Sequence, residues 1–79
     1  MTQHMTHITA LRRTSLRASQ AETQGQWHIV VQCCLICLEG ARAHQDPRAV
    51  RFFSDKLANA YLHMGMLDKA FAFEASTTH

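Results

Sequence analysis

The scarcity of helix-breaking residues constrains the fold of this chain most. Among its 79 residues the sequence has one proline, Pro47, and three glycines, at positions 25, 40 and 65. Alanine, leucine, methionine, glutamine and arginine, which favour helix, are common between these points. No strict alternation of apolar and polar residues indicates a strand, and no Asn-Gly or Asp-Gly hairpin turn occurs. The sequence therefore predicts an all-α fold.

The strongest helix signal lies between Asp46 and Gly65. Asp46 has a side chain suited to capping a helix, and Pro47 suits the first helical position because the N–H it lacks would have no partner there. Gly65 can adopt the left-handed conformation that ends a helix. The pattern predicts a helix over residues 47–64, whose apolar face consists of Val50, Phe53, Leu57, Ala60 or Tyr61, and Met64.

Three further helices follow from the same reasoning. Gly25 interrupts an otherwise helical stretch, and Asp68 is a second candidate capping residue. We therefore expect a single helical domain over residues 1–79, with residues 1–5 flexible. The connections have only a few residues, so successive helices should pack antiparallel. The four expected helices span about 6–23, 27–43, 47–64 and 68–77.

Residues 57–75 carry a pattern of large and small residues around a glycine. The segment reads LANAYLHMGMLDKAFAFEA and resembles one tetratricopeptide repeat, an antiparallel pair of helices that stacks on its neighbours. It departs from the family pattern at Glu74, where another large residue is usual. The residues that match the large, small, aromatic, glycine, large and small positions are Leu57, Ala58, Tyr61, Gly65, Leu67 and Ala70.

A second, weaker match to the same repeat surrounds Gly25, over residues 25–37. Gly25 and Gly65 are farther apart than the period of a tetratricopeptide repeat, which is about 34 residues, so the resemblance implies an insertion around residues 39–47. We expect antiparallel helical hairpins in a tetratricopeptide-like array, which would be a fragment of an α-solenoid. The alternative is an unrelated hairpin or small helical bundle, in which the first helix folds back over Phe73.

The resemblance also implies a ligand-binding face. In tetratricopeptide proteins the first helix of each repeat lines a concave surface, which corresponds here to the side of the third helix opposite Phe53 and Leu57. Asn59 occupies a position where such grooves hold a peptide backbone, whereas Asp55 stands where a peptide-carboxylate clamp prefers lysine. The alternative is an ordinary solvent-exposed face. The residues implied to face a ligand are Phe52, Lys56, Asn59 and His63.

Three cysteines lie close together in the segment CCLICL, residues 33–38. On a helix, Cys34 and Cys37 lie one turn apart and could share a metal. A structural zinc site needs four ligands, however, and no second CxxC or pair of histidines stands at ligand spacing. A redox CxxC belongs at the start of a helix, where the dipole lowers the thiol pKa, and these residues are expected in the middle of one. We therefore favour core packing of Cys33, Cys34 and Cys37, and expect no metal or cofactor.

The segment before Glu22 has three arginines and no acidic residue. Arg12, Arg13 and Arg17 could contact the phosphates of a nucleic acid, but no aromatic residues interleave them and the pI is only about 8.6. The composition is also that of a mitochondrial transit peptide, and the sequence around Ser15 resembles a basophilic kinase site. We favour an ordinary helix with a weak apolar stripe over each of these functions.

The sequence shows no catalytic arrangement and no phosphate-binding loop, so we expect a protein that is not an enzyme and has no small-molecule substrate. No apolar run approaches the roughly 18 residues of a membrane span. We therefore expect a cytoplasmic protein that does not bind membranes.

Apolar residues near the C-terminus exceed what a short last helix can bury against one neighbour. Met66, Phe71 and Phe73 point in several directions, so we expect a protein partner or a second copy of the chain to cover them. Small helical proteins of this kind include secretion chaperones and adaptors. The sequence thus predicts an interaction module; the alternatives are a nucleic-acid-binding or regulatory protein that uses the basic N-terminal helix, and a cysteine-based metal or redox protein.

Overall fold

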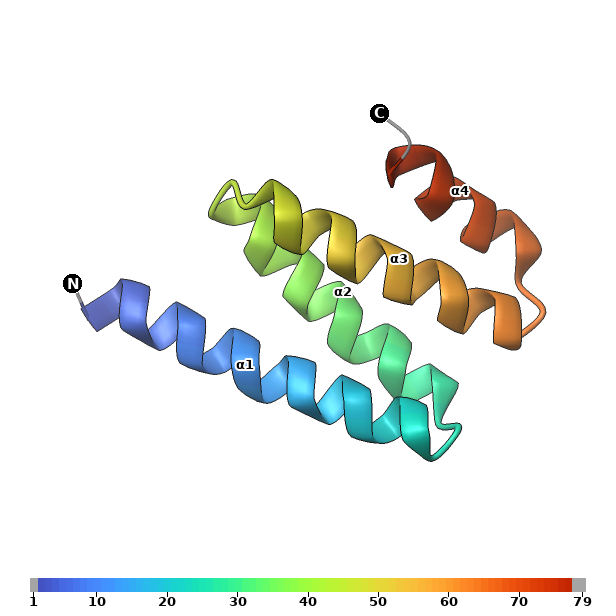
Figure 1. The fold of residues 1–79 in the computed structure, drawn as a ribbon, viewed down its shortest axis with the longest axis horizontal. Helices are drawn as coiled ribbons and strands as arrows, with labels where there is room; N and C mark the ends of the chain where they lie inside the picture. The colour runs from blue at the N-terminus through green and yellow to red at the C-terminus, as the bar shows by residue number, and fades with distance from the viewer. Residues whose placement is uncertain (1, 78–79) are drawn as a thin grey trace.

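Residues 2–77 of the chain fold into four α-helices. The computed structural model describes the backbone of residues 2–77 and the side chains of residues 9–73, and this part of the chain contains no β-strand. The all-α class is confirmed. The first helix begins earlier than residue 6, and the expected flexibility of residues 1–5 stays a prediction. The helices are α1 (Thr2–Thr23), α2 (Trp27–Ala43), α3 (Pro47–His63) and α4 (Leu67–Thr77) (Figure 1).

The ends of α3 and α4 follow the signals in the sequence with small differences. Asp46 caps α3, because its side chain accepts a hydrogen bond of 3.1 Å from the backbone N–H of Ala49. Asp68 was expected to cap α4. It does not, because α4 begins one residue before it, at Leu67. Asp68 lies instead in the first turn of α4, where its negative charge is favourable near the positive end of the helix dipole.

Three short turns of the same shape join the helices. In each turn the backbone of the middle residue is left-handed: φ is 71° at Gly25, 52° at Gln45 and 74° at Gly65. The N–H of the last turn residue bonds to a carbonyl near the end of the preceding helix, which satisfies a group that the helix itself leaves unpaired. These bonds join Gln26 to Ala21 at 2.8 Å, Asp46 to Ala41 at 2.9 Å, and Met66 to Tyr61 at 2.9 Å.

The turns recur at a constant spacing, with their middle residues at positions 25, 45 and 65, so the chain is built from similar helix-and-turn units. The stretch between Gly25 and Gly65 consists of two such units, and the expected insertion around residues 39–47 is not present. That segment completes α2 and forms a turn no longer than the other two. Buried side chains follow the same spacing, as at Ala18, Leu38 and Ala58, and at Ala21, Ala41 and Tyr61.

The four helices lie side by side in chain order and form a single layer (Figure 1). The Cα atoms span 41 × 31 × 13 Å. The backbones of helices adjacent in the sequence pack closely, α1 with α2, α2 with α3 and α3 with α4, and α1 also meets α3 through the side chains of Glu22 and Lys56. Within the described chain α1 does not reach α4, and the closed bundle considered as an alternative is not formed. A single layer leaves the outer sides of α1 and α4 uncovered.

The core runs continuously through the layer, between one helix and the next. Alanines at the helix contacts let neighbouring helices approach closely, and apolar side chains fill the remaining space. Over the described side chains, one buried polar atom has no hydrogen-bond partner, the hydroxyl oxygen of Ser54. None of the described helices is long and apolar enough to cross a bilayer. The largest fully buried side chains are Leu57, Val30, Cys34, Cys37 and Ser54.

Candidate partner-binding surface

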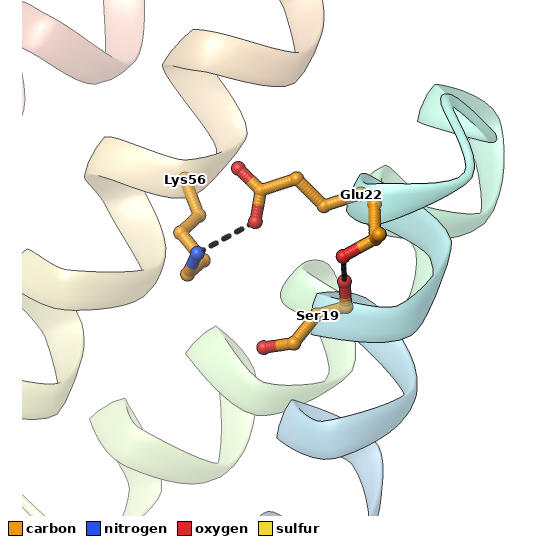
Figure 2. A network of polar contacts seen from close by, with 4 residues as sticks. Ser19, Glu22 and Lys56 are labelled. Atoms are coloured by element: carbon orange, nitrogen blue, oxygen red, sulfur yellow. Dashed lines mark hydrogen bonds and ion pairs between the residues drawn. The ribbon is translucent and has the colours of Figure 1, made fainter.

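Lys56, one of the α3 residues implied to face a ligand, connects α3 to α1. Its Nζ atom lies 2.8 Å from Oε1 of Glu22, and Figure 2 shows the two side chains extending toward each other from their helices. The same ammonium group lies 5.3 Å from the centre of the Phe52 ring, within reach of a cation–π interaction. In the same region of α1, the Thr23 hydroxyl donates a hydrogen bond of 3.0 Å to the carbonyl of Ser19. Lys56 therefore helps to hold two helices that are not neighbours in the sequence.

His63, another residue of this set, connects α3 to α2. Its ring stacks on Trp27, with ring centres 4.0 Å apart and planes inclined by 20°. The His63 Nδ1 atom lies 2.9 Å from the backbone carbonyl oxygen of Asn59, so Nδ1 carries the proton and donates. Because Trp27 is the first residue of α2 and His63 the last of α3, the stack fastens these two helix ends together.

The four α3 residues thus share one side of the helix, and they differ in what they contact. Their spacing of three and four residues places Phe52, Lys56, Asn59 and His63 on one face. Lys56 and His63 are engaged with α1 and α2, as described above. Phe52 is 49% exposed, and Asn59 is half-buried. Only part of this face is therefore available to another molecule.

The cysteines belong to the core. Cys33, Cys34 and Cys37 are all buried and are free thiols, as the packing interpretation predicts. Burial raises the pKa of the Cys34 thiol from 9.0 to about 12, and the neighbouring Cys37 adds to this effect. Burial, reinforced by Cys33, raises the pKa of Cys37 to about 11. Both thiols stay protonated at neutral pH and are poor nucleophiles. Among the described side chains, no three histidines, cysteines or acids are grouped to hold a metal.

The last turn of the array carries exposed apolar side chains that the core does not use. Leu67 is 52% exposed and Phe71 is 56% exposed on α4, and Met66 is exposed in the turn before them. Met66 and Leu67 also line a shallow hollow with Gly65 at this corner. The sequence predicted unburied apolar residues here, and the structure places Met66 and Phe71 among them.

Phe73 differs from Phe71, because it is half-buried and packs on α3. Its ring stacks on Tyr61 with centres 5.8 Å apart and planes inclined by 18°, and it adjoins the core. Its remaining exposed edge lines a shallow groove between α4 and α2. Phe73 is thus mainly a packing residue. No local pattern in the sequence marked this groove, because it forms only when α3 brings α2 and α4 together; its other residues are Leu35, Leu38, Glu39 and Arg42.

The basic residues of α1 lie on its surface. Arg12, Arg13 and Arg17 are exposed, and Ser15 is half-buried. Leu16 is also exposed among these arginines. In the described part of α1 this surface is therefore charged, with one apolar residue within it.

Comparison of the chain with protein-family models, with curated proteins and with solved structures found no match. The tetratricopeptide resemblance rests on the residues quoted in the sequence analysis and stays a prediction.

Proposed function

We propose that this chain is a non-enzymatic protein–protein interaction module, an adaptor or small chaperone, which binds a partner chain through the outer side of α4 and the turn before it. The observation that carries the proposal is the exposure of Leu67 and Phe71 at the end of a single-layer array. Full burial of such a side chain contributes roughly 1.5–3 kcal/mol. Because about half of each side chain is already covered, a partner would gain about half of that amount from each. Such a surface favours association with another apolar surface.

The arrangement of these residues supports the binding of a helix. Leu67 and Phe71 are four residues apart and therefore lie on one side of α4, one turn from each other. An apolar ridge of this kind packs against a second helix or fits into an apolar groove. The preceding turn is fixed by Gly65 and the hydrogen bond from Met66, so the ridge begins at a well-ordered position.

The α3 face has a supporting part in this proposal. Phe52 keeps about half of its surface exposed and remains a candidate contact for a partner, together with Asn59. Lys56 and His63 act there by holding α1 and α2 against α3. A partner that covers both α4 and this face would contact two sides of the same helical hairpin.

A photo-crosslinking amino acid placed at position 71 tests the proposal. In cells that express the chain, we expect a discrete crosslinked product from position 71, and none from the same group at position 32, where Gln32 is exposed on α2. The product should disappear when Leu67→Asp is added, because a charge on the ridge opposes apolar contact. Equal crosslinking from positions 71 and 32, or a product unaffected by Leu67→Asp, would exclude this surface.

A further inference from the structure

The contact between α1 and α2 leaves an apolar hollow that the proposed function does not use. Its volume is about 130 Å³, and it is more enclosed than the hollows at Met66 and at Phe73. It lies in the half of α2 that is farther from the Gly25 turn, where the two helices run side by side (Figure 1). The residues that line it are Ala10, Leu11 and Thr14 of α1, and Ile36, Cys37 and Gly40 of α2.

The repeat explains why space is left at this place. Because the turns are centred on positions 25, 45 and 65, each residue has an equivalent one unit later in the chain. Some of the lining residues are smaller than their equivalents, which lie one unit later on α2 and α3. These pairs of smaller residue and larger equivalent are Ala10 and Val30, Cys37 and Leu57, and Gly40 and Ala60.

Burial shows the consequence of these smaller side chains. Val30 and Ala60 are buried in the core, whereas Ala10 is exposed and Gly40 is half-buried. Gly40 belongs to a central helix with a packed neighbour on each side, so its incomplete burial is not caused by the end of the array. The hollow therefore occupies space that larger side chains fill one unit later.

The chemistry of the lining favours an apolar guest. None of the lining residues is charged. The Thr14 hydroxyl already donates a hydrogen bond of 2.9 Å to the carbonyl oxygen of Ala10. The Cys37 side chain is fully buried, and its sulfur lies 4.0 Å from the carbonyl oxygen of Leu11. A charged guest would lose its hydration without gaining a partner, whereas an apolar guest gains by leaving water.

We propose that this hollow binds a small, uncharged apolar molecule of about the size of benzene. An apolar cavity of about 150 Å³ inside a protein takes up benzene, and the volume of this hollow is similar. That volume accommodates a single ring and excludes a helix or a strand of a partner. The guest contacts Leu11 and Ile36 and fills the space beside Ala10 and Gly40. It is bound and not transformed, because the Cys37 thiol is buried and protonated at neutral pH.

Titration with benzene, followed by the NMR signals of methyl groups, tests the proposal. The signals of Ala10, Leu11 and Ile36 should shift and reach saturation with one guest per chain. The signals of Leu67, on the exposed side of α4, should not shift. The affinity should be weak, in the millimolar range, because so small a guest makes few contacts. Benzoate, which adds a negative charge to the same ring, should bind at least about tenfold more weakly.

Two variants that fill the hollow provide the matched comparison. Ala10→Val and Gly40→Ala introduce the residue types found at the equivalent positions 30 and 60, so each should weaken benzene binding at least about tenfold. Both should fold, and alanine also favours helix more than glycine does. Ala43→Val, on the exposed surface of α2, is the control and should bind benzene as the wild type does.

Urea unfolding gives a readout that does not depend on the NMR signals. Saturating benzene should raise the urea midpoint of the wild type and of Ala43→Val, because a guest that binds only the folded chain stabilises it. The midpoints of Ala10→Val and Gly40→Ala should not change on addition of benzene.

The opposite results overturn the inference. The absence of a saturable shift up to the solubility limit of benzene excludes the site. Equal binding by the wild type and both filling variants places the guest elsewhere, and shifts centred on Leu67 place it on α4. Benzoate that binds as tightly as benzene contradicts an uncharged guest. The methyl signals that shift in the wild type locate the guest even if a filling variant folds poorly.

Discussion

Two helices of this molecule, α3 and α4, occupy equivalent places in the repeat but have different numbers of neighbours. α3 lies between α2 and α4 and buries a continuous apolar face that includes Phe53, Leu57 and Tyr61. α4 has one neighbour, and its described side chains include one fully buried residue, Ala70. Burial in a single-layer array is therefore set by the number of packed neighbours more than by the apolar content of a helix. Stability should concentrate in the middle of the array, and binding capacity at its α4 end.

Truncation of one leucine in each helix should give the largest difference. Leu57 is fully buried in α3, so Leu57→Ala should lower the free energy of unfolding by about 2–5 kcal/mol through lost burial and a residual cavity. That is a large part of the roughly 4–12 kcal/mol expected for a domain of this length. Leu67→Ala, on the half-exposed ridge of α4, should change the free energy of unfolding by less than about 0.5 kcal/mol.

Urea unfolding followed by circular dichroism measures both effects, at a protein concentration low enough to keep the chain monomeric. Leu38→Ala, in the other central helix, serves as a second buried control. A Leu67→Ala variant destabilised as much as Leu57→Ala would show that α4 is covered in the monomer. The contrast between the two helices would then be wrong.

The sequence predicts the ends of α3, and it does so from local signals. Asp46, Pro47 and Gly65 marked the limits of α3, because capping and left-handed turns depend on residues next to each other in the chain. The sequence correctly predicts a boundary at Gln45. It does not predict the left-handed backbone there, because the residue is not a glycine. The distance between Gly25 and Gly65 contained the needed signal: halving it places a third turn midway, at Gln45. A repeat of about 34 residues predicts an insertion instead, because 40 residues exceed one such period.

The surface was harder to predict than the fold, because it depends on which helices meet. Spacing alone placed Lys56 and His63 on one face of α3, but it could not show that Glu22 and Trp27 lie opposite them. Phe71 and Phe73 are likewise close in the chain and looked alike in sequence. Packing on Tyr61 separates them, since the Phe73 ring stacks on this α3 residue whereas Phe71 is exposed. Contacts between distant segments decide such cases, and local patterns do not contain them.

The cysteines should give a second, smaller effect on the free energy of unfolding, which depends on pH. This effect also arises in the middle of the array. The folded-state pKa of Cys34, about 12, lies above the ordinary value of 9.0, so the thiol ionises first in the unfolded chain. The corresponding stability is fully present below about pH 9 and is lost as the pH rises towards 12. We expect the urea midpoint to fall between about pH 8 and pH 10.5, and to fall less in Cys34→Ala.

Thiol labelling tests the burial of the cysteines at a single pH, so that no other group has to be titrated. At neutral pH a disulfide reagent should modify the folded chain at least about tenfold more slowly than the urea-unfolded chain, because the thiolates are scarce and the sulfur atoms are buried. Ser19→Cys, on the exposed surface of α1, is the fast-reacting control. Native cysteines that react as fast as this control would place them outside the core.

The ion pair between Glu22 and Lys56 should give the smallest effect, and it sharpens the comparison by testing whether the α3 face holds α1 in place. The side chains of Lys56 and Glu22 are 23% and 31% exposed, so water and salt screen their attraction. Glu22→Gln should therefore lower the free energy of unfolding by only about 0.2–1 kcal/mol, and less in concentrated salt. The exchanged pair, Glu22→Lys with Lys56→Glu, should recover part of the loss, whereas either exchange alone should not. A different outcome is that Glu22→Gln has no effect at low salt while Lys56→Ala weakens partner binding. Lys56 would then contact the partner and not stabilise the fold. The α3 face would in that case match the ligand-binding role that the tetratricopeptide resemblance implies.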